Sequence, residues 1–426
     1  MTPEFKQRIE RIRNGEVPEG YKRTRAGIMP CDWCTQKEYK AKDIFYSVSN
    51  KNHNGDYEVL SATQDRGVIP RSQVYIDIKY DDANTSGYKM VDKGDFVISL
   101  RSFQGGIEYS EYTGLVSPAY TVLKPRVSIC DEYYKSYFKT NDFISRLNKG
   151  TYGIRDGKQV GFKDFGEMII HFPPLPEQQR IAKIISTQDK VIECYEKKIE
   201  QLKRVKKYYL QNMFPKRGET VPKIRFKGFT DPWEQRKLDN LAQFTKGTGY
   251  SKGELKESGT PIILYGRLYT KYETVITSID TFTDAKPDSV YSRGGEVIVP
   301  ASGETAEDIS IASVVEKSGV LLGGDLNIIT PSTTIDSAFL AISISNGTPH
   351  NNIAKMAQGK SVVHLHNTDL KKIDLSYPCY EEQRQISDFF KRYDNLITLH
   401  QRKLEEEKKK KKALQQLLLT GIVRTN

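Results

Sequence analysis

The sequence lacks any apolar run approaching the ~18 residues that a membrane-spanning helix needs. Its opening residues, MTPEFKQRIERIR, are charged and contain no apolar segment of the kind found in secretory signals, so we expect no secretion signal. The five cysteines are an odd number, which without such a signal indicates reduced thiols. These features argue against a membrane protein or a disulfide-built secreted domain and predict a cytoplasmic location.

Motifs for catalysis and metal binding are also missing. Cys31 and Cys34 have CxxC spacing, but no second pair of cysteines or histidines accompanies them, so we predict no metal site. The stretch AKMAQGKS resembles the end of a phosphate-binding loop, yet Ala354 stands where that motif requires glycine. The sequence contains no methylase tetrapeptide, nucleophile elbow or HExxH motif. We therefore predict no catalytic residue and no cofactor bound by this chain.

Positive charge is in excess. The chain has 65 Lys and Arg against 54 Asp and Glu, which gives a net charge of +11 and a pI of about 9.1. Such an excess favours an anionic partner, with nucleic acid first and a membrane surface second.

One charged stretch occurs twice. EQQRIAKIISTQDKVI begins at Glu177, and EQRQISDFFKRYDNLI begins 205 residues later at Glu382. Both continue with apolar residues at alternating steps of four and three, which predicts two long helices, each with a narrow seam that requires a partner helix. We expect the two helices to pack on each other, antiparallel. The predicted seam residues are Ile181, Ile185, Ile192, Tyr195, Ile199, Leu202, Ile386, Phe390, Ile397, Leu404 and Leu414.

The repeat extends beyond the helices. The only two tryptophans, Trp33 and Trp233, precede the two helices at similar distances. Between each tryptophan and the helix that follows it lies a strand-like run, GDFVIS in the first repeat and GEVIVP in the second. Short helices are expected at 133–147 and 336–345. The predicted fold is therefore α+β, with two mixed α/β domains, two long antiparallel coiled-coil helices and a pseudo-twofold internal repeat. The predicted segments are an N-terminal segment (1–25), domain one (26–168), the first helix region (169–216), domain two with its linker (217–372) and the second helix region (373–426).

Loops rich in arginine, glutamine, glycine and aromatic residues recur near corresponding positions of both repeats. Arginine and glutamine are the side chains that bond guanine and adenine edges in the major groove. This recurrence favours contact with DNA. The candidate contacts are Gln64, Arg66, Arg71, Arg101, Gln104, Tyr152, Arg155, Lys158, Arg267, Tyr269, Ser302, Gln358, Lys360 and Ser361.

Taken together, these motifs carry a family likeness. Two repeats that each open at a tryptophan and close at PPLPEQQRI or PCYEEQRQI into a long helix resemble the DNA-specificity subunit of Type I restriction–modification enzymes, as do WEQRKL and LHQRKLEE. The resemblance implies two target recognition domains held apart by two antiparallel helices, each domain reading one half of a bipartite double-stranded DNA target. It implies a non-catalytic chain that binds two methyltransferase subunits, which use S-adenosylmethionine, and through them two ATP- and Mg-dependent restriction subunits.

Two other classes of protein stay open at this point. One is a coiled-coil scaffold without DNA specificity, against which the net charge and the loops argue. The other is an enzyme that cleaves or modifies DNA by itself, against which the missing motifs argue.

Overall fold

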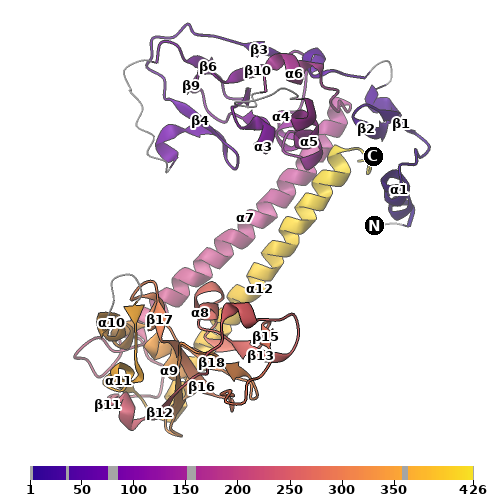
Figure 1. Ribbon diagram of the computed structural model, residues 1–426. Helices are drawn as coiled ribbons and strands as arrows, with labels where there is room; N and C mark the ends of the chain where they lie inside the picture. Colours follow the sequence, from indigo (N-terminus) through magenta and orange to yellow (C-terminus); the bar gives the residue numbers. More distant parts are fainter. Residues whose placement is uncertain (1–2, 35–37, 75–84, 151–159, 357–362, 426) are drawn as a thin grey trace. The chain divides into compact units, whose positions relative to one another are not determined.

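The computed structural model describes residues 3–34, 38–74, 85–150, 160–356 and 363–425. The chain divides into two compact units, the first made of Met1–Cys194 with Leu404–Asn426 and the second of Tyr195–Lys403. Two long helices, α7 (Leu175–Asn212) and α12 (Tyr380–Leu419), take part in both. Each unit therefore contains one mixed domain and one end of each long helix (Figure 1).

The first unit surrounds a small antiparallel sheet with the strand order β3-β10-β7-β8. Its strands are β1 (Tyr21–Thr24), β2 (Gly27–Pro30), β3 (Phe45–Val48), β4 (Leu60–Thr63), β5 (Gly67–Pro70), β6 (Lys89–Val91), β7 (Phe96–Ile98), β8 (Glu108–Tyr109), β9 (Gly114–Val116) and β10 (Thr121–Pro125). Its shorter helices are α1 (Pro3–Arg13), α2 (Ala41–Ile44), α3 (Ser102–Gly105), α4 (Asp131–Tyr137), α5 (Asn141–Gly150) and α6 (Phe162–Glu167).

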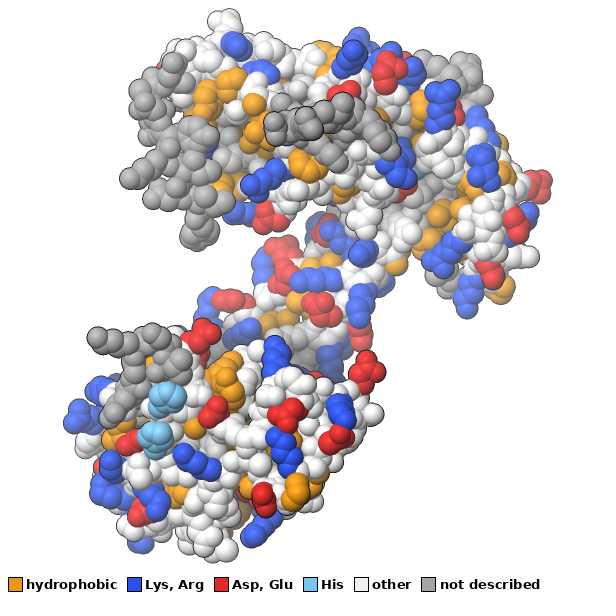
Figure 2. All heavy atoms as spheres, in the orientation of Figure 1, with side chains coloured by type: hydrophobic (Ala, Val, Ile, Leu, Met, Phe, Trp, Pro, Cys, Tyr) orange, Lys and Arg blue, Asp and Glu red, His pale blue; other side chains and the backbone are white. Residues whose placement is uncertain are grey.

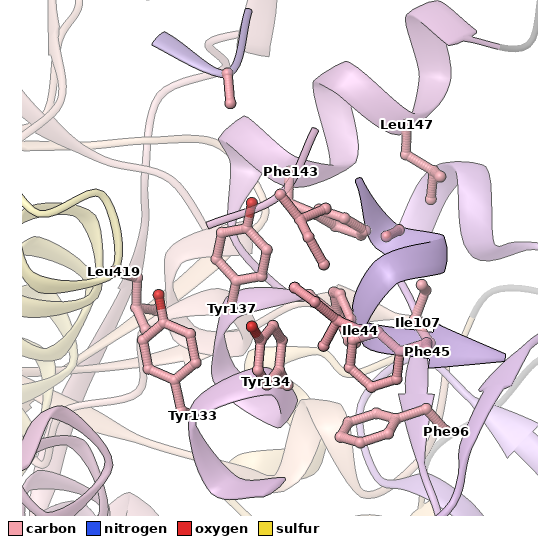
Figure 3. Close-up of a cluster of buried hydrophobic side chains, with 14 of the residues drawn as sticks. Ile44, Phe45, Phe96, Ile107, Tyr133, Tyr134, Tyr137, Phe143, Leu147 and Leu419 are labelled. Atoms are coloured by element: carbon pink, nitrogen blue, oxygen red, sulfur yellow. The ribbon is translucent and has the colours of Figure 1, made fainter. Parts of the chain in front are cut away.

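Aromatic side chains fill the core of the first unit (Figure 3). The α4 sequence DEYYKSY places three tyrosines on one side of a short helix, and all three are buried. Tyr134 meets the ring of Phe45 edge-on at 5.2 Å, and Phe45 meets Phe96 in the same way at 5.6 Å. Burying each large ring contributes about 1.5–3 kcal/mol, and edge-to-face pairs contribute about 0.5–1.5 kcal/mol more. This core joins β3, β7 and α4 into one rigid support.

The second unit contains a five-stranded sheet with the order β12-β20-β16-β18-β14. Its strands are β11 (Glu234–Lys237), β12 (Ala242–Lys246), β13 (Thr260–Ile263), β14 (Val275–Ile276), β15 (Phe282–Thr283), β16 (Glu296–Pro300), β17 (Ser302–Gly303), β18 (Ser313–Val315), β19 (Leu321–Leu322), β20 (Leu326–Pro331), β21 (Val363–His364) and β22 (Asp374–Tyr377). Its shorter helices are α8 (Gly266–Thr270), α9 (Ser337–Ile344), α10 (Gly347–Met356) and α11 (Asn367–Leu370).

The two sheets share their central pairing. In the first unit β10 lies between β3 and β7, and in the second unit β20 lies between β12 and β16, all antiparallel. Each central strand is followed by a helix, α4 or α9, that is packed into the core. The mixed domains and the internal repeat are therefore confirmed.

One detail of the predicted elements is wrong. The single helix expected at 133–147 is two helices, because the chain turns at Thr140, whose hydroxyl accepts a bond from the amide of Phe143 at 3.2 Å and starts α5. The helix expected at 336–345 is α9, with Asp336 as its N-cap. Among the described residues, no helix combines the length and apolar character needed to cross a bilayer.

Candidate nucleic-acid interface

In the first unit, the two described loops that carry candidate DNA contacts meet. One is the β4–β5 turn at residues 63–67, and the other surrounds α3. A Cβ placed on Gly105 would lie only 2.6 Å from Cγ of Gln64, so the Gln64 side chain lies directly against the end of α3. Strand pairing supports both loops, since β8 pairs with β7 and Val68 bridges to Ser110 just beyond β8.

Four candidates of the first unit are exposed on these loops, and a fifth is half-buried. Gln64 and Arg66 lie on the hairpin turn, and Arg101 and Gln104 lie at α3, whereas Arg71 is half-buried beside β5. Arg66 donates from Nη1 to the Gln73 carbonyl at 3.2 Å. The exposed amide and guanidinium groups of this surface have the donors and acceptors that base edges require.

The loops of the second unit also converge. The hydroxyl of Tyr269 on α8 donates to the carbonyl of Ser302 on β17. Ser302 in turn pairs across β17 and β21 with His364, which follows the predicted AQGKS loop. Tyr269, Ser302 and His364, from three separate segments of the sequence, are thus joined in one place.

Two candidates of the second unit are corrected by the structure. The Arg267 side chain is only 7% exposed, and its guanidinium donates to Asp280, to Glu273 at 2.7 Å and to the Ser278 carbonyl at 2.9 Å. A guanidinium engaged in this way holds its own loop together and cannot present a free fork to a base. Ser302 is also buried, so it belongs to the support of the loop rather than to its surface.

Six further candidates lie outside the described residues. They are Tyr152, Arg155, Lys158, Gln358, Lys360 and Ser361.

The repeated glutamine at the start of each long helix makes equivalent hydrogen bonds in the two units. Gln178 donates to the Pro173 carbonyl at 2.8 Å and accepts from the Cys130 amide, next to α4, at 2.9 Å. Gln383 donates to the Pro378 carbonyl at 2.9 Å and accepts from the Asp336 amide, next to α9, at 2.9 Å. A buried glutamine thus fixes each long helix to the short helix of its own domain.

Each repeated glutamate is held by an arginine that is distant in the sequence. In the second unit, Arg225 clasps the buried carboxylate of Glu382 through two bonds of 2.7 Å, and this bonding raises the pKa of Arg225. In the first unit, Arg424 clasps Glu177 at 2.7 and 2.8 Å. Such two-pronged pairs are among the strongest charged contacts in proteins. We call these pairs the two latches.

The latches differ in the additional bonds that their residues make. The indole of Trp33 donates to Glu177 at 2.9 Å, whereas the indole nitrogen of Trp233 is buried without a described partner. Arg424 also reaches Asp32 at 2.8 Å, so the first latch contains more bonds than the second.

The predicted seam residues are all buried or half-buried. At the ends they merge into the domain cores: Ile181 and Ile185 pack with Leu418 in the first unit, and Ile386 and Phe390 pack with Met213 in the second. This pairing places the start of each long helix beside the end of the other, so the helices are antiparallel as predicted.

Polar contacts cross the helix pair between its ends. In the first unit Gln188 donates to the carboxylate of Glu407, and Asp189 pairs with Lys411. In the second unit Lys206 pairs with Asp394, and the ring of Tyr195 lies 5.8 Å from that of His400. A polar residue inside an apolar seam specifies the alignment of two helices at some cost in stability.

Basic side chains are distributed over the visible surface of both units, interspersed with acidic ones (Figure 2). Within the part of the chain that is described, no three His, Cys, Asp or Glu residues come close enough to hold a metal ion. Cys31 is exposed and unbridged.

A family model described as the Type I restriction modification DNA specificity domain matches residues 36–204 and 230–408. The chain belongs to this family. Both matched ranges start near a tryptophan and end inside a long helix, so the family's unit is the same domain-plus-helix repeat that the sequence shows. The predicted resemblance is confirmed.

Relatives support this membership. The Type I restriction enzyme MjaVIII specificity subunit of Methanocaldococcus jannaschii is 26% identical over 348 residues, covering 79% of this chain and 80% of the relative. A putative MjaX specificity subunit of the same organism is 26% identical over 441 aligned positions, covering 95% and 97%. A solved chain, from a study of complex assembly and conformational transition of the type I R-M system, shares the fold with a TM-score of 0.53 at 13% identity, covering 96% of this chain and 100% of that one.

Three contributors were missed by sequence reasoning in this specificity subunit. Arg225 and Arg424 carried no local signal, because their partners are 157 and 247 residues away. Lys139 lies beneath the first-unit loops and was also missed. The only available hint was that lysine follows a run of buried aromatic residues at the end of α4.

Proposed function

We propose that each unit of this Type I specificity subunit reads one half of a bipartite target in double-stranded DNA. One observation carries the proposal: the same sheet pairing and the same latch occur in both units, and each unit joins its own candidate loops on that support. Two equivalent supports with different loops suit two half-sites of different sequence.

The long helices set the distance between the half-sites and dock the methyltransferase subunits. Their seams are buried, yet Ile184 and Val191 on α7 and Leu396 and Leu399 on α12 are 36–46% exposed. Ile184 and Val191 are seven residues apart and Leu396 and Leu399 are three apart, so each pair lies on one helix face, and an exposed apolar face suits the addition of a further helix. Two matching helices would dock two methyltransferase subunits.

The chemistry belongs to the partners. On this proposal the chain binds no cofactor, the two methyltransferase subunits carry S-adenosylmethionine, and two restriction subunits carry ATP and Mg. The chain itself neither cleaves nor methylates DNA. The complex works in the cytoplasm, on the DNA of the cell and on DNA that enters it.

Exchange of one domain tests the proposal. Residues 26–168 are replaced by those of a relative, and methylated sites are mapped in cells that express the hybrid with its methyltransferase partner. The expected result is a new sequence in one half of the target, with the other half and the spacer unchanged. A simultaneous change of both halves would contradict the division of reading between the units, as would DNA cleavage or methylation by the purified chain alone.

A further inference from the structure

Lys139 joins the two described loops of the first unit. It lies in the turn between α4 and α5, and its ammonium donates to the Gln64 carbonyl at 3.3 Å and to the Gly105 carbonyl at 2.9 Å. It also donates to the carboxylate of Glu108 on β8. An ammonium has three N–H donors. All three are therefore used, two of them on the backbones of loops that carry candidate DNA contacts.

The carboxylate opposite Lys139 is deeply buried. Glu108 has a side chain 2% exposed, and burial raises its pKa to about 7 against the opposing effect of Lys139. Its second oxygen, Oε2, has no hydrogen-bond partner among the described residues. A charged group in so dry a site is costly unless it is paired. The Lys139–Glu108 pair is therefore not an ordinary surface ion pair. The buried carboxylate holds the Lys139 ammonium in one place.

The two loops have little freedom to move apart from this support. Gly67 and Gly106 both have positive φ, and a Cβ would lie 2.7 Å from the Tyr109 carbonyl at the first and 2.0 Å from the Phe138 carbonyl at the second. One loop thus rests its backbone on β8 and the other on the end of α4, directly before Lys139. The separation between Gln64 and α3 is then fixed by these backbone contacts together with the Lys139 ammonium that bonds both loops.

We propose that Lys139 is a positioning residue for base recognition, which holds the β4–β5 turn and the α3 loop at the separation needed to read one half-site together. The inference rests on the proposed function and adds a residue whose ammonium bonds the loops themselves. Because the exposed Gln64 and Arg101 lie on different loops, their readout of neighbouring bases depends on the alignment of those loops.

The main test removes both charges of the pair. In the full chain, Lys139→Met combined with Glu108→Gln deletes the ammonium without leaving a buried unpaired carboxylate. The complex with the methyltransferase partner is then assayed for binding to a duplex with the mapped target and to duplexes with the first or the second half scrambled. We expect the preference for the correct first half to fall at least tenfold, with the preference for the second half unchanged.

Matched variants separate positioning from general stability. Lys124 bonds Asp92 and the buried Asp95 in the same unit and, among the described residues, has no hydrogen bond or ion pair with a candidate loop. Lys124→Met with Asp95→Asn should leave both preferences intact. Glu108→Gln alone, which keeps the two bonds from Lys139 to the loops, should also leave them intact.

A second variant alters the relative position of the two loops without changing Lys139. Gly105→Ala places a methyl group against the Gln64 side chain while keeping Lys139, and it should lower the first-half preference as well. If the double variant does not fold, Gly105→Ala tests whether the first-half preference depends on the alignment of the two loops. Unaltered first-half preference in the double variant, or in Gly105→Ala when only that variant folds, would overturn the role of Lys139. A wild-type complex without any sequence preference would instead overturn the proposed function.

Discussion

In the first unit a lysine ammonium holds the candidate loops, whereas in the second unit a tyrosine hydroxyl does so. Lys139 bonds two loop carbonyls and a buried carboxylate, and Tyr269 bonds the carbonyl of Ser302 beside His364. The supports below these loops are alike, down to a glutamine and a latched glutamate at the start of each long helix. The supports are alike because both must grip the same helix pair. On the proposed function, the loops differ because each has its own half-site to read.

Lengthening the helix pair is expected to have the largest effect, because it alters what both units share. Four residues inserted after Cys194 in α7 and four after Lys403 in α12 add ~6 Å to the pair at 1.5 Å per residue. With ~3.4 Å per base pair of DNA, the spacer should grow by one or two base pairs while both half-sites stay the same. Mapping of methylated sites checks this. An unchanged spacer at full activity would show that the helices do not set the distance.

Breaking the latches should have the next largest effect, and an unequal one. Arg225→Ala leaves Glu382 buried without a partner, which typically costs about 3–5 kcal/mol. Arg424→Ala should cost less, about 1–3 kcal/mol, because Glu177 keeps the bond from Trp33 and Arg424 is 25% exposed.

The two tryptophans allow each latch variant to be measured in its own unit. Urea unfolding is followed by the fluorescence of Trp233 in a Trp33→Phe background for Arg225→Ala, and of Trp33 in a Trp233→Phe background for Arg424→Ala. A larger loss for Arg424→Ala would contradict the asymmetry of the latches.

Acid should act on the first unit through two buried groups whose contributions to stability have opposite signs. His171 is buried, donates to the Leu419 carbonyl at 2.8 Å and has its pKa lowered by burial from 6.5 to about 4. The unfolded chain therefore binds a proton that the folded chain does not. The His171 contribution to stability is full above pH 6.5 and falls by roughly 3 kcal/mol as the pH drops to about 4. Glu108, whose pKa burial raises to about 7, takes up a proton on folding over the same range and contributes with the opposite sign. The corresponding position of the second unit, 205 residues later, is Ser376, which does not titrate.

The same single-tryptophan variants measure this effect between pH 7 and pH 4. His171→Asn keeps a donor near Leu419 and removes the His171 contribution, so acid should destabilise the first unit less in this variant than in the parent chain. Equal pH dependence before and after that substitution would assign the sensitivity to other groups.

Removing one base-reading side chain should have the smallest effect. Arg101→Ala or Gln104→Ala should weaken binding to the correct first half-site by ~1–3 kcal/mol relative to a scrambled one. Arg126, an exposed arginine that stacks over Tyr46 at 5.3 Å, supplies the control, and Arg126→Ala should leave the discrimination unchanged. Equal losses on all sequences would make Arg101 or Gln104 a phosphate contact instead.

The helix pair was readable from sequence because its signal is local and periodic. A 3.5-residue rhythm decides which side of a helix is buried, and the seam from Ile181 to Leu414 follows it. The importance of Glu177 and Gln178 was readable from their repetition at Glu382 and Gln383. Their partners were not, because nothing in the composition of a linker or tail indicates that one arginine will fold back onto a distant carboxylate.

The loops were harder because composition does not distinguish a surface arginine from a structural one. Arg101 and Arg267 both stand in Gly- and aromatic-rich segments. Arg267 is turned inward because the chain that follows it folds back and places Glu273 and Asp280 within bonding distance of its guanidinium. Arg101 has no such acidic neighbour bonded to it among the described residues and stays exposed.

The first latch also has a consequence for synthesis. The second unit is one continuous stretch, Tyr195–Lys403, whereas the first needs Leu404–Asn426 in addition to Met1–Cys194. Chains usually fold from the N-terminus as they emerge, at ~5–20 residues per second. Arg424 is made roughly 230 residues after Cys194, so the domain made first waits on the order of 10–50 s for its own arginine. During that interval Glu177 and the face of α7 that receives Leu418 and Leu419 are open. The second unit can therefore complete its folding before the first. The first unit stays incompletely folded during synthesis until the end of α12 is made.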